Sequence, residues 1–412
     1  MRLKSKLALL QTQASGTPAV TAPAAPAFKS GTRKRLARLH APHWAHAQGT
    51  PARSSTSAEA LAGALEGELI AEGLIRIRRR LPLEGKLGRI ALRQVRTPPR
   101  FPGQAVINRQ RRVYIDTETT GLSTGSGTLA FLIGIATVKD TEIELTQFLL
   151  TRFSAEVALL SALSATLSAD DWLISYNGKT FDVPLLITRF RMQGLSHPFD
   201  TLPHLDLLHP VRRLFGRRWS DCRLLTVEEK LIGFERSDDL PGAQAPAAWS
   251  CYLRTGHSQP LMRAVAHNRQ DIFSLAITHT AVAMAIEQPR AFDVDLYALA
   301  RWRGETSEDD ARELLRSHAD KLCDDGRRLL AQLFRRAGCW QHAVPIWETL
   351  AARGCRDSLE RLAKYHEHVS KDLAAARRCC ERLPPSPACE RRSRRISEKL
   401  HKQPPASESL FT

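Results

Sequence analysis

Residues 113–122 read Val-Tyr-Ile-Asp-Thr-Glu-Thr-Thr-Gly-Leu, an apolar run followed by two acids and a short polar turn. The apolar residues are typical of the end of a buried β-strand. Asp116 and Glu118 are separated by one residue, so on an extended chain both carboxylates point to the same face and repel each other. A cation between them would relieve this repulsion, and carboxylate oxygens favour Mg²⁺ or Mn²⁺. A lone pair of acids is more often a solvated strand end, so the other acids of the chain decide between the two interpretations.

The chain has 412 residues and a formal net charge of +17. Its hydrophobic content of 43% is enough for the cores of two or three domains. The positive charge indicates a polyanionic partner such as nucleic acid, although a basic protein without such a partner also fits.

The cysteines and the apolar runs bear on the cellular compartment. None of the eight cysteines lies in a Cys-x-x-Cys pair, which favours reduced thiols over disulfides or a zinc site. The apolar runs are shorter than the roughly 20 residues needed to cross a bilayer. Gln11 and Gln13 interrupt the N-terminal apolar run, which argues against a signal peptide. We therefore expect a cytoplasmic protein without a membrane segment.

Composition divides the chain into five segments. Residues 1–60 are rich in Ala, Pro, Ser and Thr and are expected to form a disordered basic arm. Residues 61–110 are expected to be an extension that packs on an α/β domain at residues 111–290. Helical patterns at residues 291–383 predict an all-α repeat domain, and residues 384–412 are expected to be a disordered basic tail.

The α/β domain is predicted from its apolar periodicity. Residues 113–116, 129–138 and 143–150 read as strands, and their short connections predict antiparallel neighbours. Ser154 is placed to cap a helix, and residues 172–176 read as a further strand that can lie parallel after it. This order predicts a mixed β-sheet flanked by helices. Further upstream, residues 61–70 suggest a short helix and residues 74–78 a strand.

A third acid, Asp182, follows the strand at residues 172–176 and falls in the first turn of the next helix. An acid there can simply favour the helix N-terminus, or it can be a third metal ligand. The preceding Gly-Lys-Thr at residues 178–180 is not a P-loop, because Leu173 occupies the position where that motif needs glycine.

A fourth acid and a histidine lie in an amphipathic run at residues 260–286. His267 and Asp271 are four residues apart, so they share one face of a helix. Such a pair is usually a surface interaction. Beside three other carboxylates, however, it supplies a fourth ligand and an imidazole, and the ordered set Asp-x-Glu, Asp, His-x-x-x-Asp is specific.

This ordered set resembles the DnaQ-like DEDD 3′–5′ exonuclease superfamily, whose domains have a ribonuclease-H-like fold. Asp116 and Glu118 match its first motif, Asp182 its second and Asp271 its third. The chain is closer still to the YprB-type ribonuclease-H-like family. The segments that carry this likeness are residues 119–122 (TTGL), 176–182 (YNGKTFD), 204–208 (HLDLL), 239–242 (DLPG), 252–256 (YLRTG) and 267–268 (HN). The superfamily has Tyr four residues or His five residues before its last Asp, whereas here His267 is four before and Ala266 five before.

The resemblance implies a metal-dependent 3′–5′ exonuclease acting on single-stranded DNA or RNA. It implies two Mg²⁺ or Mn²⁺ ions, about 3.5–4 Å apart, on the four acids. His267 would handle the proton of the attacking water. The residues expected to contact nucleic acid or support the site are Thr119, Gly121, Leu122, Asn177 and Asn268.

Several side chains near these motifs allow two interpretations. Tyr176 and Phe181 could stack on bases or pack in the core, and His204 and Asp206 could support the site or make structural hydrogen bonds. A strip of arginines with one tryptophan could follow a nucleic acid or form a solvated helix face. The strip comprises Arg212, Arg213, Arg217, Arg218, Trp219 and Arg223.

The C-terminal helices resemble tetratricopeptide-like repeats. Trp340 and Leu373 begin similar segments 33 residues apart, against a period of about 34. Such helix pairs could dock a protein partner or cap the α/β domain.

Two other classes of function remain open beside the exonuclease. One is a non-catalytic nucleic-acid-binding scaffold, and the other is a structure-specific endonuclease on the same fold. A binding module has no need for four clustered acids, which favours an enzyme. No motif separates DNA from RNA as the substrate.

Overall fold

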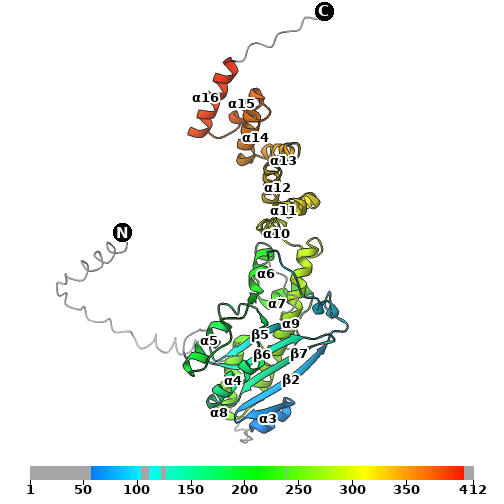
Figure 1. The fold of residues 1–412 in the computed structure, drawn as a ribbon, viewed down its shortest axis with the longest axis vertical. Helices are drawn as coiled ribbons and strands as arrows, with labels where there is room; N and C mark the ends of the chain where they lie inside the picture. Colours follow the sequence, from blue (N-terminus) through cyan, green and yellow to red (C-terminus); the bar gives the residue numbers. More distant parts are fainter. Residues whose placement is uncertain (1–56, 104–110, 122–126, 238, 403–412) are drawn as a thin grey trace, which may run out of the picture. The chain divides into compact units, whose positions relative to one another are not determined.

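The computed structural model describes residues 57–103, 111–121, 127–237 and 239–402 (Figure 1). Most of the expected N-terminal arm and the nucleotide-contact candidate Leu122 lie outside these residues. Among the described helices, none combines the length and apolar character needed to cross a bilayer.

A mixed β-sheet forms the centre of the α/β part. Its seven strands within the described residues run in the order β1-β2-β7-β6-β5-β8-β9. Pairing is antiparallel from β1 to β5 and parallel from β5 through β8 to β9. The strands are β1 (Gly67–Ala71), β2 (Leu74–Pro82), β5 (Arg111–Thr119), β6 (Ala130–Val138), β7 (Glu142–Leu150), β8 (Asp171–Ser175) and β9 (His204–Asp206). The predicted mixed sheet with flanking helices is confirmed.

Three local boundaries differ from the sequence analysis. Strand β5 continues to Thr119, beyond the predicted end at Asp116, so Glu118 also lies within the strand. The helix expected at residues 61–70 is α3 (Ala58–Ala64), which ends earlier, and residues 67–70 belong to β1 instead. Ser154 does not cap α4 (Glu156–Thr166), because it lies in the short 3₁₀ turn η2 (Phe153–Ala155).

The extension at residues 61–103 is part of the main sheet. Strand β2 pairs with β7 along its whole length, from the pair Leu74 and Leu150 to the pair Pro82 and Glu142. Beyond it lie the small hairpin of β3 (Lys86–Leu87) and β4 (Ile90–Ala91) and the 3₁₀ turn η1 (Leu92–Arg96).

Helices cover both faces of the sheet and bury two separate apolar clusters. The first contains Tyr114, Leu145 and Ile174 from the strands and packs against α6 (Leu208–Phe215), η3 (Glu228–Ile232) and the later part of α9 (Gln259–Glu287). The second contains Val113 and Ile115 and packs against α4, α5 (Asp182–Met192) and α8 (Ala245–Thr255). Alternate β5 residues therefore face opposite layers, as the pleat of a strand requires.

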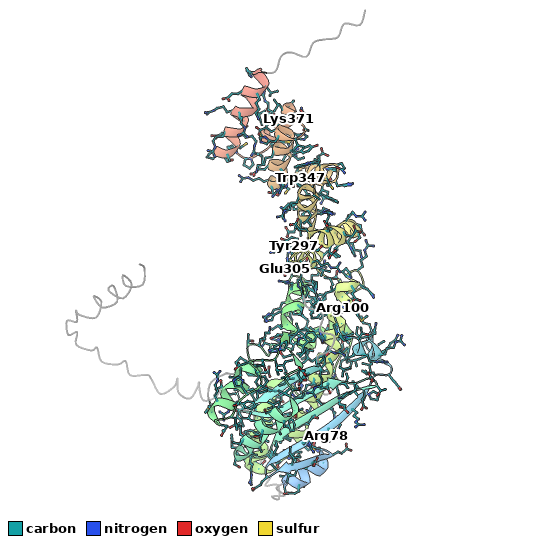
Figure 2. All side chains as sticks on the ribbon, viewed as in Figure 1. Arg78, Arg100, Tyr297, Glu305, Trp347 and Lys371 are labelled. Carbon is teal, nitrogen blue, oxygen red and sulfur yellow. The ribbon has the colours of Figure 1, made fainter. Side chains whose placement is uncertain are left out.

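Beyond residue 291 the described chain is helical. Its helices are α10 (Leu296–Arg303), α11 (Glu308–Ser317), α12 (Asp324–Arg336), α13 (Trp340–Ala352), α14 (Arg356–His368), α15 (Leu373–Glu381) and α16 (Pro387–Lys402). Trp340 and Leu373 are the first residues of α13 and α15, as the 33-residue spacing predicts. The preceding turns contain Gly338 with φ 74° and Lys371 with φ 60°, again 33 residues apart. Lys371 is labelled among these helices in Figure 2. The tetratricopeptide-like class of these helices stays a prediction.

Helix α16 corrects the expectation of a disordered tail from residue 384. Its basic side chains surround Glu367 of α14, which is 1% exposed. Arg395 donates to both carboxylate oxygens at 2.6 and 2.7 Å, and Lys399 donates to one at 2.9 Å. The hydrogen bonds from Arg395 lower the pKa of Glu367 to about 2. Positive charge that suggested a solvated tail therefore attaches the helix to a buried acid.

We expect Glu367→Ala to loosen α16, because it leaves several cations around a buried position without their acid. Breaking such a pair should cost about 1–3 kcal/mol, so tryptic cleavage within residues 387–402 should become about 10–100 times faster. Exchange of Glu360 for Ala is the control, because this half-exposed acid of α14 pairs with Arg356 of the same helix. Equal cleavage rates for wild type and Glu367→Ala would show that Glu367 does not hold the helix.

Candidate active site

Strand β5 places the first two acids on one face of the sheet. Asp116 is opposite Gly134 of β6, and Glu118 is opposite Leu132. Glu118 is 8% exposed. Thr117 lies between them and donates a 2.5 Å hydrogen bond to Oδ1 of Asp182, the first residue of α5. The second motif is thereby tied directly to the first.

Gly134 allows α9 to lie against the sheet beside Asp116. A Cβ atom on Gly134 would lie 2.0 Å from Cδ1 of Ile272 and 2.4 Å from Oδ1 of Asn268. Both distances are far below van der Waals contact, so only glycine fits at this position. The missing side chain brings the third motif, which lies on α9, to the first.

Asn268 connects this helix to Asp116 through its side-chain amide. It is completely buried, and its Nδ2 donates to Oδ2 of Asp116 at 2.8 Å. Its Oδ1 accepts from Nε2 of Gln147 at 2.8 Å, and the same Nε2 donates to the Val265 carbonyl at 2.9 Å. Gln147 thus fixes the orientation of the Asn268 amide, and Asn268 fixes the Asp116 carboxylate.

The turn before α5 explains the motif Tyr-Asn-Gly-Lys at residues 176–179. Asn177 has φ 65°, in the left-handed region that asparagine tolerates better than most residues. A Cβ on Gly178 would lie 2.4 Å from the Ser175 hydroxyl oxygen. The buried Asp206 accepts hydrogen bonds from the backbone amides of Asn177 at 2.7 Å and Lys179 at 3.1 Å. Asp206 therefore shapes the turn that delivers Asp182 to the site.

Other predicted residues near the site have structural contacts. His204 Nε2 lies 2.7 Å from the Ser175 hydroxyl, and burial lowers the pKa of His204 to about 4. The Tyr176 hydroxyl donates to the Cys222 carbonyl at 2.5 Å. Thr119 is buried, and its hydroxyl donates to the Gly121 carbonyl at 2.7 Å.

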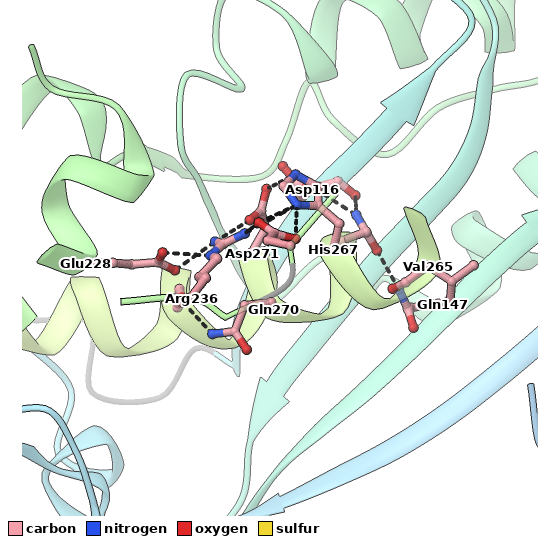
Figure 3. A network of polar contacts seen from close by, with 11 residues as sticks. Asp116, Gln147, Glu228, Arg236, Val265, His267, Gln270 and Asp271 are labelled. Carbon is pink, nitrogen blue, oxygen red and sulfur yellow. Dashed lines mark hydrogen bonds and ion pairs between the residues drawn. The ribbon is translucent and has the colours of Figure 1, made fainter. Parts of the chain in front are cut away.

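A buried arginine joins Asp271 of the third motif to two further acids (Figure 3). Arg236, with a side chain only 5% exposed, donates Nε and Nη2 to the two oxygens of Glu228, each at 2.7 Å. Its Nη1 donates to Asp239 at 2.8 Å, and Nη2 also donates to Oδ1 of Asp271. His267 Nε2 lies 3.5 Å from Oδ2 of the same Asp271. Asp271 therefore faces the arginine with one oxygen and the histidine with the other.

The electrostatics show how close the acids are to one another. Burial, and then repulsion by Asp271 and Asp182, raises the pKa of Glu118 to about 9. Burial and the same two neighbours, together with Glu118, also raise the pKa of Asp116, against the hydrogen bond from Asn268. Burial raises the pKa of Asp182 to about 6 in spite of the bond from Thr117. The structure thus brings all four predicted acids together, with His267 beside Asp271.

In the described part of the chain, no three acid, histidine or cysteine side chains form a closed metal-binding cluster. Protein donors hold several of the acids instead: Asn268 holds Asp116, Thr117 holds Asp182 and Arg236 holds Asp271. The excess of negative charge and the all-oxygen donor set nevertheless fit Mg²⁺ or Mn²⁺. The acids would have to move closer around an ion to coordinate it.

The basic strip forms ion pairs with acids in and between the helices that follow, at residues 293–325. Arg213 pairs with Glu305, Arg217 with Asp325 and Arg218 with Asp293. Trp219 stacks on Phe215, with ring centroids 4.2 Å apart and planes 9° apart. Three of the arginines are thus paired with acids and the tryptophan ring lies on a core residue, while both interpretations of the strip stay predictions.

Four important residues escaped the sequence analysis as site components. Gln147 was visible only as the single amide of strand β7, which also carries Glu142, Glu144 and Thr146. Glu228 and Arg236 lie in a mixed-charge stretch without any spacing rule. Asp239 appeared in the Asp-Leu-Pro-Gly segment, but no role followed from its position.

The fold and the acid set define a member of the ribonuclease-H-like class, which is a nuclease fold. A family model described as the RNase_H superfamily matches residues 113–282. The chain is also 32% identical over 309 residues to the uncharacterized protein YprB of Bacillus subtilis (strain 168), covering 71% of this chain and 73% of that protein. The chain belongs to this YprB family of the RNase_H superfamily.

We expect Glu118→Gln to stabilise the metal-free protein at alkaline pH. Folded Glu118 keeps its proton up to a pKa of about 9, whereas the unfolded group loses it near 4.5. The folded state binds more protons in this window, so the stability of wild type falls as pH rises through it. Glutamine removes that titration.

The measurement is thermal unfolding in chelator from about pH 5 to about pH 8, with the exposed Glu84→Gln as control. Toward pH 8, the free energy of unfolding of Glu118→Gln should exceed that of wild type by about 1–3 kcal/mol, or roughly 2–6 °C in Tm. Parallel curves for the variant and wild type would contradict the raised pKa. In excess Mn²⁺, wild type should become the more stable of the two proteins, because it keeps the Glu118 carboxylate that binds the ion.

Proposed function

We propose that this protein is a metal-dependent 3′–5′ exonuclease that hydrolyses single-stranded nucleic acid. The observation that carries the proposal is the convergence of Asp116, Glu118, Asp182 and Asp271 with His267 beside Asp271. A nuclease fold implies a nucleic-acid substrate, and the net charge of +17 suits a polyanion.

The acids would hold two Mg²⁺ or Mn²⁺ ions, whose chemistry when bound is to activate water and stabilise the leaving oxygen. Asn268 and Gln147 hold the Asp116 carboxylate in place, and Thr117 holds Asp182. His267, on the helix turn beside Asp271, would accept a proton from the attacking water. These residues would thereby supply the oxygen ligands and a base.

The turn after Glu118 is the proposed place of the terminal nucleotide. The hydrogen bond from Thr119 to the Gly121 carbonyl shapes this turn directly beside the acids. The remaining contact candidates, Gly121, Leu122 and Asn177, stay predictions for nucleic-acid binding.

Residues 291–383 are proposed as a helical-repeat domain that caps the α/β part or docks a protein partner. The ion pairs from Arg213, Arg217 and Arg218 to acids of this segment support the capping role.

We expect purified protein with Mn²⁺ to shorten single strands stepwise from the 3′ end, as read with 3′- and 5′-labelled DNA and RNA. Asp116→Ala should abolish activity, because the first acid of the set is lost, while His267→Ala should lose about 10²–10⁴-fold. The exposed Asp140→Ala is the matched control.

Circular single strands separate the exonuclease from an endonuclease, since circles have no 3′ end. Intact circles beside degraded linear strands support the proposal. Cleaved circles would instead indicate an endonuclease. Binding without cleavage of any substrate would favour the scaffold.

A further inference from the structure

Asp239 makes the closest polar contacts of the His267 ring. Its two carboxylate oxygens lie 2.8 and 2.9 Å from Nδ1 of His267, and Nη1 of Arg236 lies 3.3 Å from the same nitrogen. Hydrogen bonds with His267 and Arg236 outweigh the effect of burial and lower the pKa of Asp239. An ionised carboxylate only accepts hydrogen bonds, so the short contact requires the proton on Nδ1. Both oxygens of Asp239 lie closer to Nδ1 than Nη1 of Arg236 does, and this Nη1 donates to Asp239 at 2.8 Å, so the carboxylate is the closest partner of the ring nitrogen.

A proton on Nδ1 leaves the lone pair of the neutral ring on Nε2. Nε2 points toward the acid cluster, 3.5 Å from Oδ2 of Asp271. Gly242 lies beside it, and a Cβ on Gly242 would be 3.2 Å from Nε2. In the segment Asp-Leu-Pro-Gly at residues 239–242, Asp239 therefore contacts Nδ1 of the ring, whereas Gly242 leaves space beside Nε2.

Arg236 gives this arrangement a fixed support. Its side chain is 5% exposed and its partner Glu228 is 1% exposed, and the two are joined by two hydrogen bonds of 2.7 Å. The same guanidinium holds Asp239 and Asp271. Asp239, which contacts His267, and Asp271, which lies four residues after His267, thus both bind the buried guanidinium of Arg236.

We propose that Arg236, Asp239 and Gly242 are positioning residues that hold His267 as the Nδ1-protonated tautomer with Nε2 directed at the acid cluster. The tautomer is a property of the folded chain, whereas its effect on catalysis rests on the proposed exonuclease function. The competing explanation is an ion-pair network that only stabilises the loop. Asp239 would then affect folding and not the state of the ring.

The first test is a long-range ¹H–¹⁵N spectrum of the full-length chain labelled with ¹⁵N-histidine, at a pH where the ring is neutral. The His267 signals are assigned by their loss in His267→Gln. We expect a protonated Nδ1 and an unprotonated Nε2 in wild type, and a shift toward the Nε2-protonated form in Asp239→Ala. A proton on Nε2 in wild type, or an unchanged ring in Asp239→Ala, overturns the proposal. This test needs no nuclease activity.

The second test is a double-mutant cycle on strand degradation. Asp239→Ala should lower kcat about 10–100-fold with little change in KM, and Asp239→Glu should restore part of the loss. In the His267→Ala background, Asp239→Ala should have no further effect, because Asp239 acts through the ring. Equal losses in both backgrounds would mean that Asp239 acts independently of His267.

Gly242→Ala provides a variant that keeps every charge of the network. It should lower kcat while His267 stays protonated on Nδ1, since the added methyl group crowds Nε2 only. Unchanged kcat would remove Gly242 from the proposal. If wild type degrades no substrate, the proposed function fails and the spectrum alone decides whether Asp239 positions the ring.

Discussion

The contact between α9 and the sheet at Gly134 determines where the candidate site forms. Helix α9 carries His267, Asn268 and Asp271, while the first two acids lie on β5. A side chain at residue 134 would occupy the space of Asn268 and Ile272, and the helix would have to move away from the sheet. The hydrogen bond from Asn268 to Asp116 would then be lost. One absent Cβ thus joins motifs that are separated by about 150 residues of sequence.

Repulsion among the acids is the cost of this arrangement. The fold compensates it unevenly: Asp271 has Arg236, Asp182 has Thr117 and Asp116 has Asn268. Burial, and then repulsion by Asp271 and Asp182, raises the pKa of Glu118, so this acid becomes charged more easily with a cation beside it. Buried charge without a partner destabilises a folded chain, so such a cluster is retained where it binds something positive. This reasoning favours a cation site over a purely structural role for the acids.

The sequence predicted what depends on local periodicity. Alternation places Asp116 and Glu118 on one face, and the four-residue spacing places His267 and Asp271 on one helix face; the structure has both. The tertiary contacts could not be predicted from the sequence. Arg236 reaches Glu228 and Asp271 through a loop without regular spacing, and nothing in the composition of α16 indicates that its cations surround Glu367. Basic residues look alike in sequence whether they meet solvent, nucleic acid or a buried acid.

Helix α9 also explains why the polar cluster can be so deeply placed. Its early residues Leu261 and Val265 belong to one apolar cluster, and its later residues from Ile272 onward belong to the other. His267, Asn268 and Asp271 lie on the segment between, where the helix passes from one cluster to the other. Apolar packing on both sides holds this segment without using its polar side chains. The helix can therefore present three polar groups to β5, because its stability comes from the residues before and after them.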